Sequence, residues 1–354
     1  YESYKEWINN LPINAYPEVF GLHENADITC AQNETFATLE TLLSLQPRVS
    51  GGGGLSRDDQ LAELARDILK RIPSSINFEQ VTRKFPVLYE QSMNTVLQQE
   101  IIRYNSLLPV INSSLKQLLK AIKGTVVMSD ALEKLGDSMF ANQLPDMWRS
   151  APCYETLKPL ASWVADLEDR LAFFQKWVDE GIPRAFWISA FFFPQAFITG
   201  TQQNFARKQQ IAIDEVDFDY VVKNGVYDVD GVDQMPDSGC IIYGPFLEGC
   251  RWNDDTGVLD ESRPKELYTP MPCIWFKPGR NLESPVGPAP FFETIDPQKR
   301  QVYACPLYKT IVRAGTLSTS GHSTNHVVEI MLPSDRPQSH WIKRSVALFC
   351  ALMT

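Results

Sequence analysis

The sequence predicts an α+β fold, in which an N-terminal all-α half is followed by a small antiparallel barrel or curled sheet. From Thr35 to about Lys208, apolar residues recur with a period near 3.6, which is typical of amphipathic helices. After Lys208 they fall into short runs punctuated by Pro, Gly and Asp, which is typical of strands and turns. The 354 residues are 44% hydrophobic and 21% charged, so the composition is globular and the length suffices for one large hydrophobic core or for two.

Capping residues and prolines delimit the predicted helices. The first helix places its apolar residues from Phe36 to Leu45 near one face. Ser56 supplies the N-cap of the second, which has an acidic first turn and ends near Pro73. Within the longest helix, Pro109 should cause a kink because it removes one hydrogen bond. The predicted helices cover residues 34–46, 56–73, 77–85, 88–124, 129–140 and 157–180.

The second half reads as a series of short strands separated by loop-rich segments. Five or six strands with alternating faces suggest antiparallel pairing. The predicted strands cover residues 240–250, 272–279, 301–310, 326–333 and 341–352, with a sixth over 211–222.

Between the two halves lies an unusually apolar segment, GIPRAFWISAFFFPQAFITGTQQNFARK, over 181–208. Its run of apolar and small residues stops after nine at Pro194, whereas a membrane span needs about 20. We therefore expect a helix buried between the other helices and the sheet, and a docking surface for a partner remains the alternative. The candidate residues of this interdomain helix are Trp187, Phe191, Phe192, Phe193, Phe197, Gln203 and Arg207.

Charge and cysteine content narrow the function classes. The net charge of −10 disfavours a nucleic-acid partner. Seven cysteines without a CxxC pair, and with no visible signal peptide, predict free thiols in a reducing compartment. The sequence has no initiator Met and opens within a helical pattern, so we expect a fragment of a longer protein.

The glycine run Gly51–Gly54 invites a phosphate-binding interpretation that its neighbours do not support. A P-loop lies between a strand and a helix and carries a lysine directly after its last glycine. Here Leu55 follows, and a helix precedes. A flexible linker fits better, and we expect the protein to bind no nucleotide or other cofactor by itself.

Three further motifs lack the spacing that their chemistry requires. His322 and His326 lie about 13 Å apart if they belong to a strand, too far to share a metal ion. The stretch LSTSGH at 317–322 has Ser318 where a nucleophile elbow needs its first glycine. In the acidic stretch 214–237, a calcium loop starting at Asp228 would put Gly239 where the bidentate glutamate belongs. We expect no metal site and no catalytic residue, and hence a structural or regulatory role.

Long stretches of the sequence resemble the C-terminal region of dynein heavy chains. The residues that carry the resemblance are PEVFGLHENADI (Pro17–Ile28), QSMNTVLQQEIIRYN (Gln91–Asn105), FWISAFFFPQAFITGTQQNFARK (Phe186–Lys208), LSTSGHSTNHVVEIMLPSD (Leu317–Asp335) and the closing HWIKRSVALFCALM. The GHSTN motif and the full-length β half resemble the axonemal rather than the cytoplasmic heavy chains.

The resemblance implies a fold, partners and a location. Residues 1–22 would end the lid of the last AAA+ module, 23–209 would form a helical subdomain, and 210–354 a small antiparallel open β-barrel. The domain would lie across the AAA+ ring of a minus-end-directed microtubule motor in the axoneme of a cilium or flagellum. ATP hydrolysis belongs to other parts of such a protein, so the resemblance implies no catalytic residue here. It also implies partners in the ring modules and the dynein arm, and neither nucleic acid nor membrane.

A second hypothesis from another class stays open. The protein would then be a free-standing scaffold whose β half binds a peptide or protein. The two hypotheses are distinguished by whether the parent gene encodes this segment at the end of a very long AAA+ chain.

Overall fold

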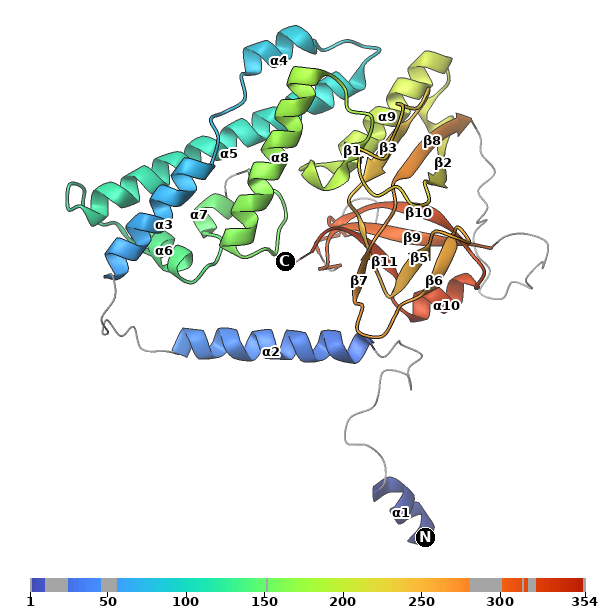
Figure 1. Ribbon diagram of the computed structural model, residues 1–354, viewed down its shortest axis with the longest axis horizontal. Helices are drawn as coiled ribbons and strands as arrows, with labels where there is room; N and C mark the ends of the chain where they lie inside the picture. Colours follow the sequence, from blue (N-terminus) through green and yellow to red (C-terminus); the bar gives the residue numbers. More distant parts are fainter. Residues whose placement is uncertain are drawn as a thin grey trace.

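The chain folds into a helical bundle joined to two β-sheets (Figure 1). The computed structural model describes residues 2–9, 25–45, 56–150, 152–280, 301–313, 315–317 and 323–352. The helices are α1 (Glu2–Asn9), α2 (Asn25–Leu45), α3 (Arg57–Arg71), α4 (Phe78–Lys84), α5 (Ser92–Ile122), α6 (Asp130–Phe140), α7 (Asp146–Arg149), α8 (Leu160–Glu180), α9 (Pro194–Gln209) and α10 (Gln338–Lys343). The strands are β1 (Phe186–Trp187), β2 (Val216–Val222), β3 (Cys240–Tyr243), β4 (Phe246–Glu248), β5 (Cys250–Asn253), β6 (Val258–Glu261), β7 (Tyr268–Pro270), β8 (Ile274–Arg280), β9 (Gln301–Thr310), β10 (His326–Ser334) and β11 (Ala347–Ala351).

Side-chain caps start three helices of the bundle, α3, α4 and α6, and the cap at Ser56 was predicted. The Ser56 side chain accepts a hydrogen bond from the backbone N–H of Asp59 and starts α3. Asn77 caps α4 and Ser129 caps α6 in the same way. The long helix α5 continues unbroken through Pro109, and its apolar positions from Met93 to Ile111 that recur with a period near 3.6 are buried. Helix α7 was not predicted.

Helix α2 lies apart from the bundle formed by α3 to α8 (Figure 1). Its first residue, Asn25, donates hydrogen bonds to the carbonyls of Arg263 and Glu266 and accepts one from the N–H of Lys265. Phe36 and Leu39, on the predicted apolar face, are exposed. Among the described residues, α2 is therefore anchored to the β half at its N-terminal end.

The strands form two mixed sheets, so the expected antiparallel barrel is not confirmed. One sheet has the order β1-β3-β8-β2 and the other β5-β6-β10-β9-β11-β4-β7. Strands β1 and β3, β6 and β10, and β9 and β11 pair in parallel, and the remaining pairs are antiparallel. The α+β class with helices first and sheets second is confirmed. The division at residues 209 and 210 stays a prediction.

The apolar segment after α8 is not one helix, and this prediction was wrong. Phe186 and Trp187 form β1, residues Ile188–Ala190 make a 3-10 turn, and α9 begins only at Pro194. A proline suits the first position of a helix because it has no N–H to leave unpaired, and it disfavours helical backbone in the residue before it. Phe193 accordingly takes a non-helical conformation (φ −124°, ψ 75°).

Two predicted strands are interrupted. The stretch 240–250 divides into β3, β4 and the start of β5, because Gly244 and Gly249 adopt positive φ angles of 96° and 77°. The stretch 341–352 begins inside α10 and reaches β11 only after Ser345, whose φ is 54°. Strands β6 and β7 were not predicted.

Gly249→Ala is expected to destabilise the fold by about 2–4 kcal/mol, because an alanine there meets both a strained backbone and a clash. A Cβ atom at Gly249 would lie 2.7 Å from the carbonyl oxygen of Arg344. Gly225→Ala is the matched control, since Gly225 has a similar φ of 74° and no heavy atom within 4 Å of the added Cβ. Urea unfolding of both variants measures the difference. Equal losses of unfolding free energy in the two variants would show that the backbone at Arg344 moves away from the added methyl group at little cost.

Among the described residues, one large hydrophobic core runs from α3 through α5 and α8 to β11, so of the two arrangements that the length allows the structure has the single large core. A small satellite cluster of Ala185, Val232, Ile241 and Cys273 lies beside it. The bundle and sheets are therefore joined by a continuous apolar interior. All seven cysteines are free, as predicted.

Candidate functional site at the helix–sheet seam

The seam between bundle and sheets is formed by residues 186–207 and the side chains packed against them. Phe191 lies at its centre, with its ring 4.6 Å from that of Phe197 and 5.5 Å from that of Phe174. Trp177 and Phe186 complete an aromatic cluster around this pair. The seam is therefore buried by rings from α8, α9 and β1.

The seven predicted residues occupy three environments. Phe191, Phe192 and Phe197 are buried, and Trp187 is partly buried. Phe193 is 47% exposed. Gln203 and Arg207 lie on α9 facing Ser92 at the start of α5, where the Ser92 hydroxyl donates to Gln203 Oε1 at 2.8 Å and accepts from Arg207 at 2.6 Å. These seven residues stay candidates for a functional role.

A buried carboxylate holds the middle of the seam in place. Glu100, from α5, is about 1% exposed and accepts hydrogen bonds from the backbone N–H groups of Phe192 (2.7 Å) and Phe193 (3.3 Å). It also pairs with Arg103 at 2.8 Å. Burial raises the pKa of Glu100, while the N–H donors and Arg103 oppose that shift. Glu100 replaces the intrahelical partners that this non-helical stretch lacks.

A second buried charge network lies on α8. Arg170 donates from Nε to Asp166 at 2.6 Å, and Asp166 also binds Lys158 at 3.1 Å. The Arg170 guanidinium lies 3.8 Å from the centre of the Tyr154 ring. Burial disfavours the charged form of Asp166, but Arg170 and Lys158 outweigh it and lower its pKa. The network is therefore charged at neutral pH.

Polar contacts tie the seam to both halves of the molecule. The hydroxyl of Ser189 donates to the carbonyl of Cys350 in β11, and the amide of Gln195 donates to the carbonyl of His326 in β10 at 2.7 Å. From the bundle, the Tyr104 hydroxyl donates to the carbonyl of Ala190 at 2.6 Å. The seam is thus hydrogen-bonded to α5 on one flank and to the larger sheet on the other.

Burial governs the chemistry of the thiols around the seam. It raises the pKa of Cys153 to about 11 and that of Cys350 to about 12. Both thiols are protonated at neutral pH, so neither supplies a thiolate nucleophile.

Sequence reasoning missed Glu100, Asp166 and Arg170, although a signal was present. Glu100 falls on the apolar stripe of α5, four residues after Val96 and four before Tyr104. Asp166 and Arg170 likewise fall on the buried face of α8. A charged residue in register with an apolar helix face is the signature of a buried, paired charge.

The acidic loop forms a local turn. The Asp228 carboxylate accepts hydrogen bonds from the backbone N–H groups of Asp230 (3.0 Å) and Gly231 (3.1 Å). Within the described part of the molecule, no three His, Cys, Asp or Glu side chains gather as metal ligands would. Gly51–Gly54, Ser318 and His322 lie outside the described residues.

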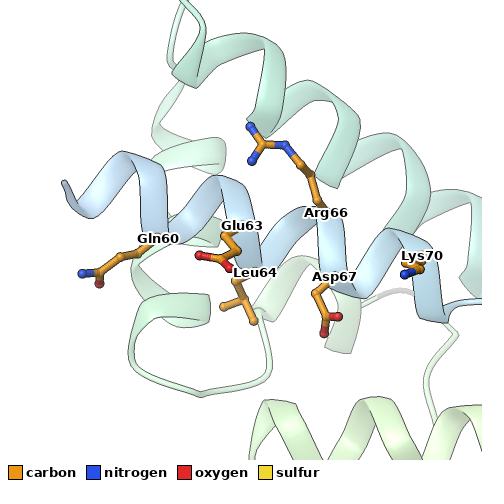
Figure 2. A pocket seen from close by; sticks show the side chains of 6 residues that line it. All are labelled: Gln60, Glu63, Leu64, Arg66, Asp67 and Lys70. Atoms are coloured by element: carbon orange, nitrogen blue, oxygen red, sulfur yellow. The ribbon is translucent and has the colours of Figure 1, made fainter. Parts of the chain in front are cut away.

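A shallow hollow of about 560 Å³ lies along the exposed face of α3 (Figure 2). Six residues of this one helix line it, with Glu63 and Asp67 alternating with Arg66 and Lys70. Figure 2 shows these side chains fanning outward rather than toward a common point. The hollow therefore lacks the convergent polar groups of a ligand site.

Comparison with known proteins identifies the family of this protein, which the geometry of the seam does not. The family model for the C-terminal domain of dynein heavy chains matches residues 32–350. The protein belongs to this family. The dynein resemblance is thereby confirmed.

Curated relatives of this dynein domain have axonemal names. The sequence is 53% identical over 349 residues to dynein axonemal heavy chain 1 of Rattus norvegicus. The aligned region is 99% of this chain and 7% of that protein. It is 49% identical over 352 residues to dynein axonemal heavy chain 3 of Mus musculus. That aligned region is 99% of this chain and 8% of the relative. Dynein axonemal heavy chain 12 of Homo sapiens is 44% identical over 354 residues, or 99% of this chain and 11% of that relative. The domain therefore spans about a tenth or less of the length of these relatives.

Proposed function

We propose that this protein is a non-catalytic regulatory and structural domain of an axonemal dynein heavy chain. In this proposal it lies across the AAA+ ring of a minus-end-directed microtubule motor in a cilium or flagellum and tunes motility. Membership of the family of dynein C-terminal domains supports the proposal. Its relatives are much longer axonemal proteins, which favours this role over that of a free-standing scaffold.

The continuous core supports a mechanical role. A domain without chemistry of its own alters an ATPase only by binding its conformations unequally. To do so it must resist deformation, and here one apolar interior and the seam hydrogen bonds join bundle and sheets. A differential of about 1–3 kcal/mol, typical of allosteric coupling, changes a ratio of states by roughly 5–150-fold.

On this proposal the partners are ring modules of the same heavy chain and the rest of the dynein arm. The domain would need no nucleotide, metal or other cofactor of its own, and would bind neither nucleic acid nor membrane. Within the described segments, no helix combines the length and apolar character of a membrane span.

A motor truncated after Gln209 is expected to keep hydrolysing ATP while gliding microtubules with altered velocity or force. Because the truncation uncovers buried rings of the seam, a second motor carries Ser189→Ala, which removes only the hydrogen bond to the Cys350 carbonyl. The Ser189→Ala motor should change gliding velocity or force in the same direction as the truncation, by a smaller amount. Gln60→Ala, on the exposed face of α3, is the control.

ATPase and gliding assays under load decide the outcome. Gliding indistinguishable from the intact motor at every load would refute the proposal. Loss of ATPase from a truncated motor whose ring is intact in micrographs would also refute it, because the domain would then belong to the hydrolytic machinery.

A further inference from the structure

A small pit opens where the bundle, the seam, β9 and β11 meet. It has room for about one water-sized group, roughly 10 Å³. Its polar and charged lining comes from Tyr154, Glu155, Arg170, Ser189 and Lys309. These residues belong to four separate stretches of the sequence, so only the folded molecule assembles the pit.

The lining includes two deeply buried polar side chains, Tyr154 and Arg170. Tyr154 is 5% exposed, and its hydroxyl has no hydrogen-bond partner among the described residues. Arg170 is 2% exposed, and its Nε is already engaged by Asp166. A hydroxyl donor and a guanidinium together suit an oxygen that carries negative charge.

Lys309 adds a cation to the lining. It is partly buried, and no carboxylate within the described ranges lies close enough to form an ion pair with it. Burial lowers its pKa, and the charges of Glu155 and Glu100 only partly oppose this. Among the described residues Lys309 therefore has no anionic partner at ion-pairing distance, and an arriving carboxylate would supply one.

An exposed aromatic ring lies beside the pit. Phe193 follows Phe192 and precedes Pro194, both of which line the pit, and it is 47% exposed. Arg103 lies 4.5 Å and Lys309 5.1 Å from the centre of its ring. Two cation–π contacts hold the ring in place, and a rigid exposed ring beside cations is typical of an anchor point in an interface.

We propose that the pit anchors a carboxylate side chain from a protein segment outside this domain, and that Phe193 packs against an apolar side chain next to that carboxylate. The pit admits about one oxygen atom, so a single carboxylate oxygen would enter it while the rest of the carboxylate stays at the mouth. Most of the contact must then come from the Phe193 surface, which only a ligand with an apolar body can use. The proposal needs only the folded domain and is independent of any role in a motor.

The probes are the peptide acetyl-Phe-Glu-Leu-amide, its Gln counterpart, and acetate. Binding is followed through the NMR shift of the Ala351 methyl group, which lines the pit. The Glu peptide is expected to shift this signal saturably, and the Gln peptide to bind at least about tenfold more weakly because it brings no charge. Acetate should require far higher concentrations, since it cannot contact Phe193.

Lys309→Met is expected to reduce binding of the Glu peptide to the level of the Gln peptide. Lys277→Met is the matched control, because Lys277 is an exposed cation over the Trp275 ring on β8. Phe193→Ala is a second variant that should weaken both peptides without affecting acetate. Thermal unfolding verifies that each variant is folded.

Three results would overturn the proposal. Equal binding of the two peptides would show that no carboxylate is recognised. Acetate acting at the same concentration as the Glu peptide would indicate an adventitious ion only. Unchanged Glu-peptide binding in both Lys309→Met and Phe193→Ala would place the contact elsewhere.

Discussion

Phe191→Asp is expected to abolish stable folding of the domain. The Phe191 ring is 3% exposed and lies among Phe174, Trp177 and Phe197. Truncating a buried phenylalanine alone costs about 3–5 kcal/mol, and an unpaired carboxylate in the same place adds its own desolvation. Since a whole domain is stable by only about 5–15 kcal/mol, this is a large part of the total. Circular dichroism and urea unfolding measure the loss.

Phe193→Asp is the matched control, made two residues away with the same chemical change. Phe193 is exposed, lies beside Arg103 and Lys309, and occupies the N-cap of α9, where aspartate is favourable. Its unfolding free energy should stay within about 1 kcal/mol of the parent value. If Phe191→Asp melts like the parent, the Phe191 side chain faces solvent and the packing described for the seam is wrong.

Arg170→Leu is expected to destabilise the fold by about 3–5 kcal/mol, because it leaves Asp166 buried without its main partner. Both side chains are almost fully buried, at 3% and 5% exposed. Arg71→Leu is the control, since Arg71 pairs with Glu168 on the same helix as Asp166 but both are about a third exposed. That change should cost about 1 kcal/mol or less.

The double variant Arg170→Leu/Asp166→Leu separates lost pairing from lost packing. Removing both charges should recover much of the single variant's loss, because the two most deeply buried charges are then gone and only Lys158, whose side chain is 18% exposed, loses its partner. A single-variant loss no larger than that of the control, or a double variant worse than the single, would contradict a buried ion pair.

The same pair predicts an acid-side pH dependence. Because the pKa of Asp166 is lowered in the folded state, its contribution to stability is present above the ordinary aspartate pKa and is lost as pH falls through the folded value. The double variant should lack this part of the acid-induced loss. Urea unfolding between pH 2.5 and 7, a range about the ordinary pKa of aspartate, measures it.

The apolar segment 181–208 shows which parts of the secondary structure could be predicted from the sequence. Nine apolar and small residues are compatible with a buried helix or a buried strand, since burial on all sides removes the periodicity that separates the two. Pro194 was a usable signal, because it marks the first turn of α9 and disfavours helix before it. The pairing of Phe186 with Ile242 was not predictable from the segment itself.

For the buried charges, the sequence indicates the charged residue but not its partners. Glu100 was visible as an acid on the apolar stripe of α5, but its role depends on the backbone N–H groups of Phe192 and Phe193, which lie far away in the sequence. The pit at Lys309 is likewise assembled from stretches that no local pattern connects.

The sequence by itself determined the α+β class, the helices of the bundle except α7, and the family. Caps such as Ser56 and Ser129 and the 3.6-residue period of α5 act within about one helical turn, so they can be read without knowing the rest of the molecule. Only the tertiary structure decided the mixed pairing of the sheets, the division of the apolar segment into β1 and α9, and the partners of the buried charges. Each of these depends on groups brought together from distant parts of the sequence, where hydrogen bonding and burial outweigh local preference.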